Sequence, residues 1–133
     1  DEFALQMIKT IDQMPWFDLG FCPKSLLLLF SSLALSTKYR KTRKRKWLAL
    51  SRKRIRELER LCKIKGTNSW HRCVIMEAHL RSAKGGDQAA NQASYDNAIS
   101  AAIRSGNDHD AALCAQLAGE YFLSLTEEGD KSM

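Results

Sequence analysis

Hydrophobic residues recur at intervals of three and four along most of the chain, the spacing that places them on one face of an α-helix. Short polar or glycine-containing segments interrupt this pattern. The pattern predicts six helices, which cover residues 1–14, 24–35, 39–65, 70–84, 87–104 and 108–125. Only two prolines and seven glycines occur in 133 residues, which favours helices over a β fold with many turns.

The last four of these helices each have a face that we expect to point into a core. In 39–65 that face holds Trp47, Leu48, Ser51, Ile55, Leu58, Leu61 and Cys62. In 70–84 it holds Trp70, Val74, Ala78, Leu80 and Arg81, and in 87–104 it holds Ala90, Tyr95, Ala98, Ile99 and Ala102. In 108–125 it holds Ala112, Leu113, Leu117, Ala118, Tyr121, Phe122 and Leu125.

Residues that favour helix ends support several of these boundaries. Pro15 ends the first helix, and an apolar linker follows it up to residue 23. Residues 66–69 close the helix 39–65 and supply a cap for the next one. Asp87 follows two glycines and is a predicted N-cap, and Gly106 suits the left-handed conformation found just after a helix.

The spacing of the helix starts predicts the fold. Starts near 70, 87 and 108 imply a helical hairpin that repeats about every 34 to 40 residues, the period of tetratricopeptide-like arrays. We therefore expect an all-α fold of antiparallel helical hairpins stacked as a short tetratricopeptide-like solenoid. The expected divisions are an N-terminal helix and apolar linker at 1–23, a helical-hairpin domain at 24–126 and a polar tail at 127–133. The last helix has a broad apolar surface, which we expect to pack on the previous hairpin alone, to meet further chain or to be covered by a partner.

Positive charge is concentrated in one stretch. The chain has a net charge of +6, but residues 38–60 alone hold twelve Lys and Arg against Glu57 and Glu59, a local +10, so the rest of the chain sums to −4. An anionic partner would therefore meet the chain at this stretch.

The most apolar segment precedes this basic stretch. It runs for about ten residues near Leu26 to Leu35, whereas a membrane-spanning helix needs about twenty. Lys24 and Lys38 limit its extension in either direction. The segment predicts a helix buried on most faces, and peripheral membrane contact is an alternative because the cationic residues follow directly.

Residues able to carry out chemistry are few and scattered. The cysteines at 22, 62, 73 and 114 show no paired spacing, and together with His71 and His79 they fit no metal-binding module. We expect buried or half-buried thiols in a reducing compartment. None of the three histidines has a Ser or Cys partner at a recognisable spacing. We therefore expect no enzymatic activity and no cofactor.

Several stretches resemble a known family. They are the cationic helix around Arg43, residues 68–71, 77–78 and 85–86, Tyr95-Asp96-Asn97-Ala98-Ile99, and residues 101–102, 105–106, 109–113 and 117–123. Together they resemble the tetratricopeptide-like region of large multidomain signalling ATPases found in microalgae, over about residues 17–133. In those proteins a kinase-like region and an AAA/STAND-type ATPase precede the array, and a histidine kinase or cyclase often follows. The resemblance implies a helical scaffold, because neither the phosphate-binding loop nor the kinase catalytic loop occurs in this chain.

These observations predict a non-catalytic scaffold that mediates protein–protein interaction, with the apolar end of the solenoid and the basic helix as contacts. The predicted contact residues are Arg40, Lys41, Arg43, Lys44, Arg45 and Lys46, extended by Arg52, Lys53 and Arg56. The alternatives are a small structural subunit docked on a larger assembly, soluble or membrane-associated, or binding of RNA or anionic lipid through the basic helix. A calmodulin-type target helix also fits this composition. We expect an intracellular protein, soluble or peripheral to a membrane, and the compartment stays open.

Overall fold

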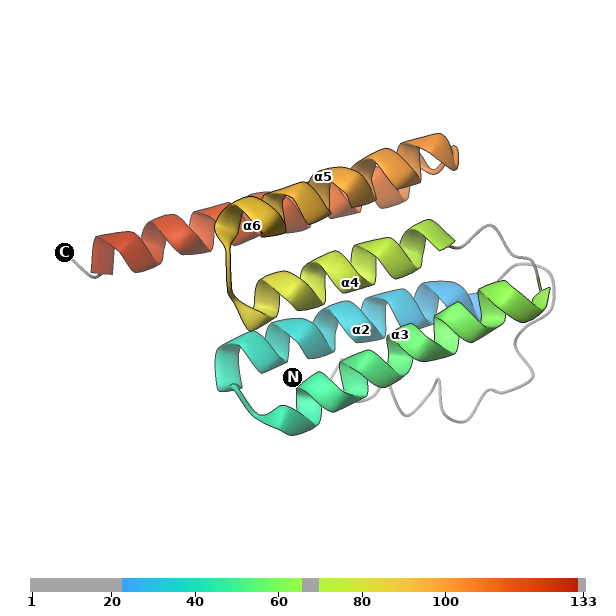
Figure 1. The fold of residues 1–133 in the computed structure, drawn as a ribbon, viewed down its shortest axis with the longest axis horizontal. Coiled ribbons are helices and arrows are strands. Elements are labelled where there is room, and N and C mark those ends of the chain that lie inside the picture. Colours follow the sequence, from blue (N-terminus) through green and yellow to red (C-terminus); the bar gives the residue numbers. More distant parts are fainter. Residues whose placement is uncertain (1–22, 66–69, 132–133) are drawn as a thin grey trace.

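Five α-helices and no strand make up the part of the chain that the structure, a computed structural model, describes, which is residues 23–65 and 70–131 (Figure 1). The helices are α2 (Pro23–Thr42), α3 (Arg45–Lys65), α4 (Trp70–Lys84), α5 (Gln88–Arg104) and α6 (Asp108–Lys131). The predicted all-α class is confirmed. The predicted helix at 1–14, most of the linker after it and the predicted cap at 66–69 lie outside the described residues.

Consecutive helices run antiparallel, so α2, α4 and α6 point in one direction and α3 and α5 in the other (Figure 1). Each helix packs against the next one in the chain. In addition α4 packs against both α2 and α6, while α3 and α5 do not touch each other. Helix α4 is therefore the central element, in contact with all four other described helices.

The central position of α4 explains its burial. Its buried residues are His71, Cys73, Ile75, Met76, Ala78, His79, Leu80, Ser82 and Ala83. The prediction of a single inward face was wrong here: Trp70 is 53 % exposed, and Arg81 is also exposed. A helix covered from several sides has no single apolar stripe, so periodicity could not identify its inner side.

Helix α2 confirms the prediction of a helix buried on most faces. Four serines within its apolar sequence are buried, and two of them, Ser32 and Ser36, form hydrogen bonds with Ser51 of α3 at 3.0 and 2.8 Å. Only Leu26 and Phe30 of its large apolar residues are exposed. Within the described residues no helix has the length and apolar character needed to cross a membrane.

The predicted start of the basic helix at Tyr39 was wrong. Helix α2 continues to Thr42, the chain turns at Arg43 and Lys44, and α3 begins at Arg45. Arg43 has a φ of 59°, in the left-handed region that a non-glycine residue rarely adopts. The turn is favoured because it folds α3 back on α2, and packing of the two apolar faces then outweighs one unfavourable residue. No glycine or proline marks this turn in the sequence.

The remaining helices mostly follow the prediction. Asp87 caps α5 by accepting a hydrogen bond from the Ala89 amide, and Gly106 has a φ of 74°. The predicted inward residues Tyr95 and Ala98 are fully buried. Ala112 was placed inward but is exposed, and the backbone of α6 continues beyond Leu125 to Lys131.

Candidate functional site

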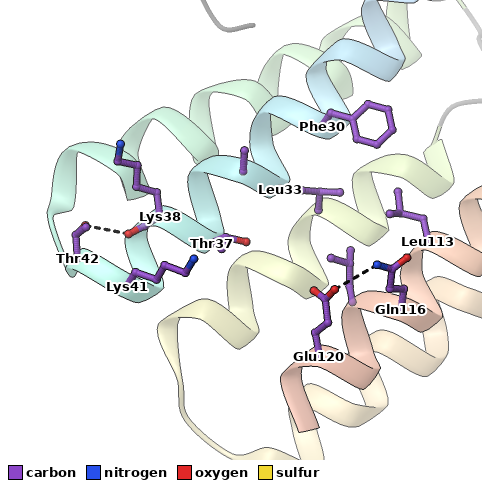
Figure 2. Close-up of a pocket in the computed structure, with 11 residues that line it drawn as sticks. Phe30, Leu33, Thr37, Lys38, Lys41, Thr42, Leu113, Gln116 and Glu120 are labelled. Carbon is purple, nitrogen blue, oxygen red and sulfur yellow. Dashed lines mark hydrogen bonds between the residues drawn. The ribbon is translucent and has the colours of Figure 1, made fainter. Parts of the chain in front are cut away.

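A groove of about 490 Å³ runs between α2 and α6, two helices that are far apart in the sequence (Figure 2). Helix α2 contributes Phe30, Leu33, Ala34, Thr37, Lys38, Lys41 and Thr42 to its lining, and helix α6 contributes Leu113, Gln116, Leu117 and Glu120. On α2 these residues recur every three or four positions, so they form one stripe along the helix. The same holds for α6.

Polarity changes along the groove in the same sense on both walls. Because α2 and α6 run in the same direction, the apolar Phe30 and Leu33 share one end with Leu113, and Lys41 shares the other end with Glu120 (Figure 2). The Phe30 side chain is 40 % exposed. The groove therefore has an apolar end and a charged end.

The charged end holds two lysines with different surroundings. The Lys38 ammonium lies 4.6 Å from the centre of the Trp47 ring, a cation–π contact that limits its movement. Lys41 is exposed and forms no salt bridge within residues 23–65 and 70–131. On the opposite wall Glu120 accepts a hydrogen bond from the Gln116 side chain at 3.2 Å. The α2 wall is thus positive and the α6 wall negative.

The turn between α2 and α3 begins at this charged end. We name residues 41–46 the basic turn, because five of the six are Lys or Arg and all six are exposed. The guanidinium of Arg43 donates a hydrogen bond to the Ala83 carbonyl at 3.2 Å and lies 5.6 Å from the centre of the Tyr39 ring. These contacts hold the turn against the end of α4. The basic turn therefore has a fixed conformation and a high density of positive charge.

The nine predicted contact residues do not lie on one helix. Five of them belong to the basic turn. Arg40 is half-buried and lies close enough to His79 to help lower the pKa of its imidazole. Arg52, Lys53 and Arg56 are on the exposed side of α3, and Arg52 and Arg56 line a separate groove of about 290 Å³ that also contains Glu59 and Glu77.

The two groups therefore differ in their electrostatic surroundings. Two carboxylates, those of Glu59 and Glu77, line the same groove as Arg52 and Arg56, whereas one carboxylate, that of Glu120, lines the α2–α6 groove with Lys41 of the basic turn. Arg54, from the same basic stretch, is buried and forms a salt bridge with Glu57 at 2.7 Å. Tertiary structure thus leaves the basic turn as the strongest surface for an anionic partner.

Sequence reasoning did not identify the groove. Its apolar wall lies in a run of leucines whose pattern is apolar almost all round, so Phe30 gave no signal of exposure. Leu117 was predicted to face inward, and it does contact the core while also lining the groove. Gln116 and Glu120, four residues apart beside Leu113 and Leu117, were visible in the sequence, but nothing there indicated that α2 lies opposite them.

A buried polar chain connects α2, α4 and α5 beneath the groove. Thr37 is hydrogen-bonded to Nε2 of His79 at 2.9 Å, Nδ1 of His79 is hydrogen-bonded to the Tyr95 hydroxyl at 3.1 Å, and that hydroxyl is hydrogen-bonded to the Ser82 hydroxyl at 2.6 Å. Ser82 donates to the His79 carbonyl at 2.8 Å. Burial, followed by the charge of Arg40, lowers the pKa of His79 to about 4, and burial raises the pKa of Tyr95 to about 12.

A second buried cluster joins α2, α4 and α6. Asp110 accepts from Nε2 of His71 at 2.6 Å and from Nε of Arg72 at 2.7 Å, and Arg72 also donates to Ser25 at 2.9 Å. Nδ1 of His71 is buried and has no hydrogen-bond partner. The Arg72–Asp110 ion pair joins α4 to α6, and the hydrogen bond from Arg72 to Ser25 adds α2. Among the described residues no hydroxyl or thiol is hydrogen-bonded to the ring of His71. Among the described residues no group of three or more His, Cys, Asp or Glu side chains is arranged to hold a metal ion.

Comparison of the chain with protein-family models, with curated proteins and with solved structures finds no match.

Proposed function

We propose that this chain is a non-catalytic helical scaffold that binds an acidic segment of another protein. The observation that carries the proposal is the groove between α2 and α6, with Lys38 and Lys41 at one end and the basic turn directly beside it (Figure 2). An open, partly apolar groove with fixed charge at one end is suited to recognising a peptide segment. The resemblance to the helical array of signalling ATPases supports the same class of function.

The helix arrangement supports a tetratricopeptide-like stack within this proposal. Alternate helices α2, α4 and α6 run in one direction, and α4 contacts both of the others, while α3 and α5 lie apart. In a stack of hairpins the first helices of successive repeats pack side by side and line one face. The α2–α6 groove would then be that face, with α4 between its walls.

An acidic protein explains the surface better than RNA does. Binding of single-stranded RNA usually combines phosphate contacts with aromatic rings on which bases stack. Trp47 is buried, and the ammonium groups of Lys38 and Lys46 each lie 4.6 Å from the centre of its ring. Tyr39 is covered in part by Arg43. The basic turn therefore offers cations but no open aromatic platform.

The proposal is tested by removing charge from the basic turn without disturbing its hydrogen bond. The variant is Lys44→Ala, Arg45→Ala and Lys46→Ala, and Arg43 is kept because it contacts Ala83. A matched control removes three exposed cations at the opposite end of the molecule, Arg60, Lys63 and Arg104. Binding to fluorescent peptides rich in Asp, Glu and Leu is followed by anisotropy at low and high salt.

We expect the basic-turn variant to lose at least tenfold in affinity at low salt, and the control to lose less than threefold. Affinity of the unchanged chain should fall steeply as salt rises, because counterions screen exposed charges. Equal affinity of the variant and the unchanged chain would contradict the proposal, and so would a preference for oligonucleotides over acidic peptides.

A further inference from the structure

We propose that the α2–α6 groove binds an extended segment of a partner protein in which an apolar side chain and a carboxylate side chain are four residues apart. The inference rests on the proposed function, since it assumes that the partner is a protein, and it names the sequence pattern that the groove would recognise. Four observations support it: the length of the groove, the polarity of its ends, the opposite charge of its walls and the rigidity of its frame.

The length of the groove fits a short extended segment. The lining stretch of α2 runs from Phe30 to Thr42, a rise of about 18 Å at 1.5 Å per residue. An extended chain covers the same length with about five or six residues at roughly 3.3 Å each.

The polarity of the two ends sets the spacing of the recognised side chains. The pair Phe30 and Leu33 precedes the pair Lys38 and Lys41 by eight residues, which is about 12 Å along α2. In an extended segment, side chains at positions i and i+4 point to the same side and are about 13 Å apart. An apolar side chain at one of these positions would contact Phe30 and Leu33, and a carboxylate at the other would lie near Lys41.

The two walls orient the segment. Lys41 on α2 attracts a carboxylate, whereas Glu120 on α6 repels it and accepts hydrogen bonds from N–H groups (Figure 2). Carboxylate side chains should therefore turn toward α2, and backbone amides toward α6. No charged side chain lines the apolar end, so a carboxylate there would lose solvation without gaining a partner, which is unfavourable.

The frame of the groove is already fixed before binding. At the apolar end Arg72 of α4 is hydrogen-bonded to Ser25 of α2 and to Asp110 of α6, so one side chain connects both walls. Further along, the bond from Thr37 to His79 ties α2 to α4. A frame held by buried hydrogen bonds loses little conformational freedom on binding, which favours affinity.

The experiment uses the full chain, labelled with ¹⁵N, and three synthetic heptapeptides with serine at the other positions. The first carries Leu and Asp four residues apart, the second carries Leu and Lys, and the third carries Ser and Asp. We expect the first peptide to shift the amide resonances of Leu33, Thr37, Lys41 and Leu117, with the other two binding at least tenfold more weakly. The substitution Lys41→Glu should lower the affinity for the first peptide at least tenfold and raise the affinity for the second.

Lys63→Glu is the matched control, since Lys63 is an exposed lysine that neither lines the groove nor belongs to the basic turn. It should change the affinity for the first peptide less than threefold. Shifts confined to α3 would overturn the groove inference while leaving binding by the basic turn intact, and equal effects of Lys41→Glu and Lys63→Glu would overturn it as well. Dodecanoate is titrated as a further probe, and shifts in the groove with dodecanoate but with none of the peptides would also overturn it. Failure of the acidic peptides in both this test and the basic-turn experiment would overturn the proposed function itself.

Discussion

The polar groups on the buried side of α2 differ from those on its exposed side in the hydrogen bonds and salt bridges that they form within the chain. On the buried side Ser32 and Ser36 each form a hydrogen bond with Ser51 of α3. On the exposed side Lys41 forms no salt bridge within the described part of the chain, and Phe30 remains accessible. Helix α2 therefore both stabilises the fold and forms one wall of the groove. Groups that have partners within the chain should control stability, and those without should control binding.

The largest effect is expected from removing the carboxylate that joins α4 to α6. Asp110→Ala leaves Arg72 without its ionic partner in a largely buried position, and breaking such a pair costs about 3–5 kcal/mol. The matched control is Asp108→Ala, an exposed residue in the first turn of the same helix, which should cost about 0.3–1 kcal/mol through the helix dipole. Urea unfolding measures both values. Equal losses would show that the buried cluster does not hold the helices together.

The second effect concerns the pH dependence of stability. His79 has its pKa lowered from 6.5 to about 4 in the folded chain, chiefly by burial, so the unfolded chain binds a proton more readily than the folded one. The contribution of neutral His79 to the free energy of unfolding is complete above pH 6.5 and is lost as pH falls toward 4. The loss is about 1 kcal/mol per pH unit and reaches about 3 kcal/mol in all. Glu77, whose pKa is raised by burial and by Glu59, acts in the opposite direction.

A comparison with His79→Gln isolates the histidine, because both proteins retain Glu77. The free energy of unfolding should fall more steeply with acid in the unchanged chain than in the glutamine variant between pH 6.5 and 4.5. Parallel curves would mean that His79 is not held neutral in the folded state.

The smallest effect on stability is expected in the basic turn. The variant Lys44→Ala, Arg45→Ala and Lys46→Ala removes exposed cations without a salt bridge in the described residues, together with the cation–π contact of Lys46 with Trp47, so the free energy of unfolding should fall by no more than about 1 kcal/mol. Relief of repulsion between like charges could even stabilise the chain slightly. A decrease of more than about 2 kcal/mol in the free energy of unfolding, measured by heat or urea, would show that these residues stabilise the fold. The contrast between the two sides of α2 would then not hold.

Local features of the sequence were sufficient for the later helices. Asp87 and Gly106 determine helix ends through their own backbone and side-chain chemistry, and the inward positions of Tyr95 and Ala98 follow from a helix that packs on one side. These properties depend on neighbours within a few residues. They were therefore predictable from the chain alone.

Only the tertiary structure decided the turn at Arg43, the exposure of Trp70 and the division of the basic residues between two surfaces. It also created the groove, whose walls Phe30 and Leu113 lie on helices separated by α3, α4 and α5 in the chain. Each of these features depends on packing between distant segments. Periodicity records which faces of a helix are apolar, but it does not record which other helix covers them.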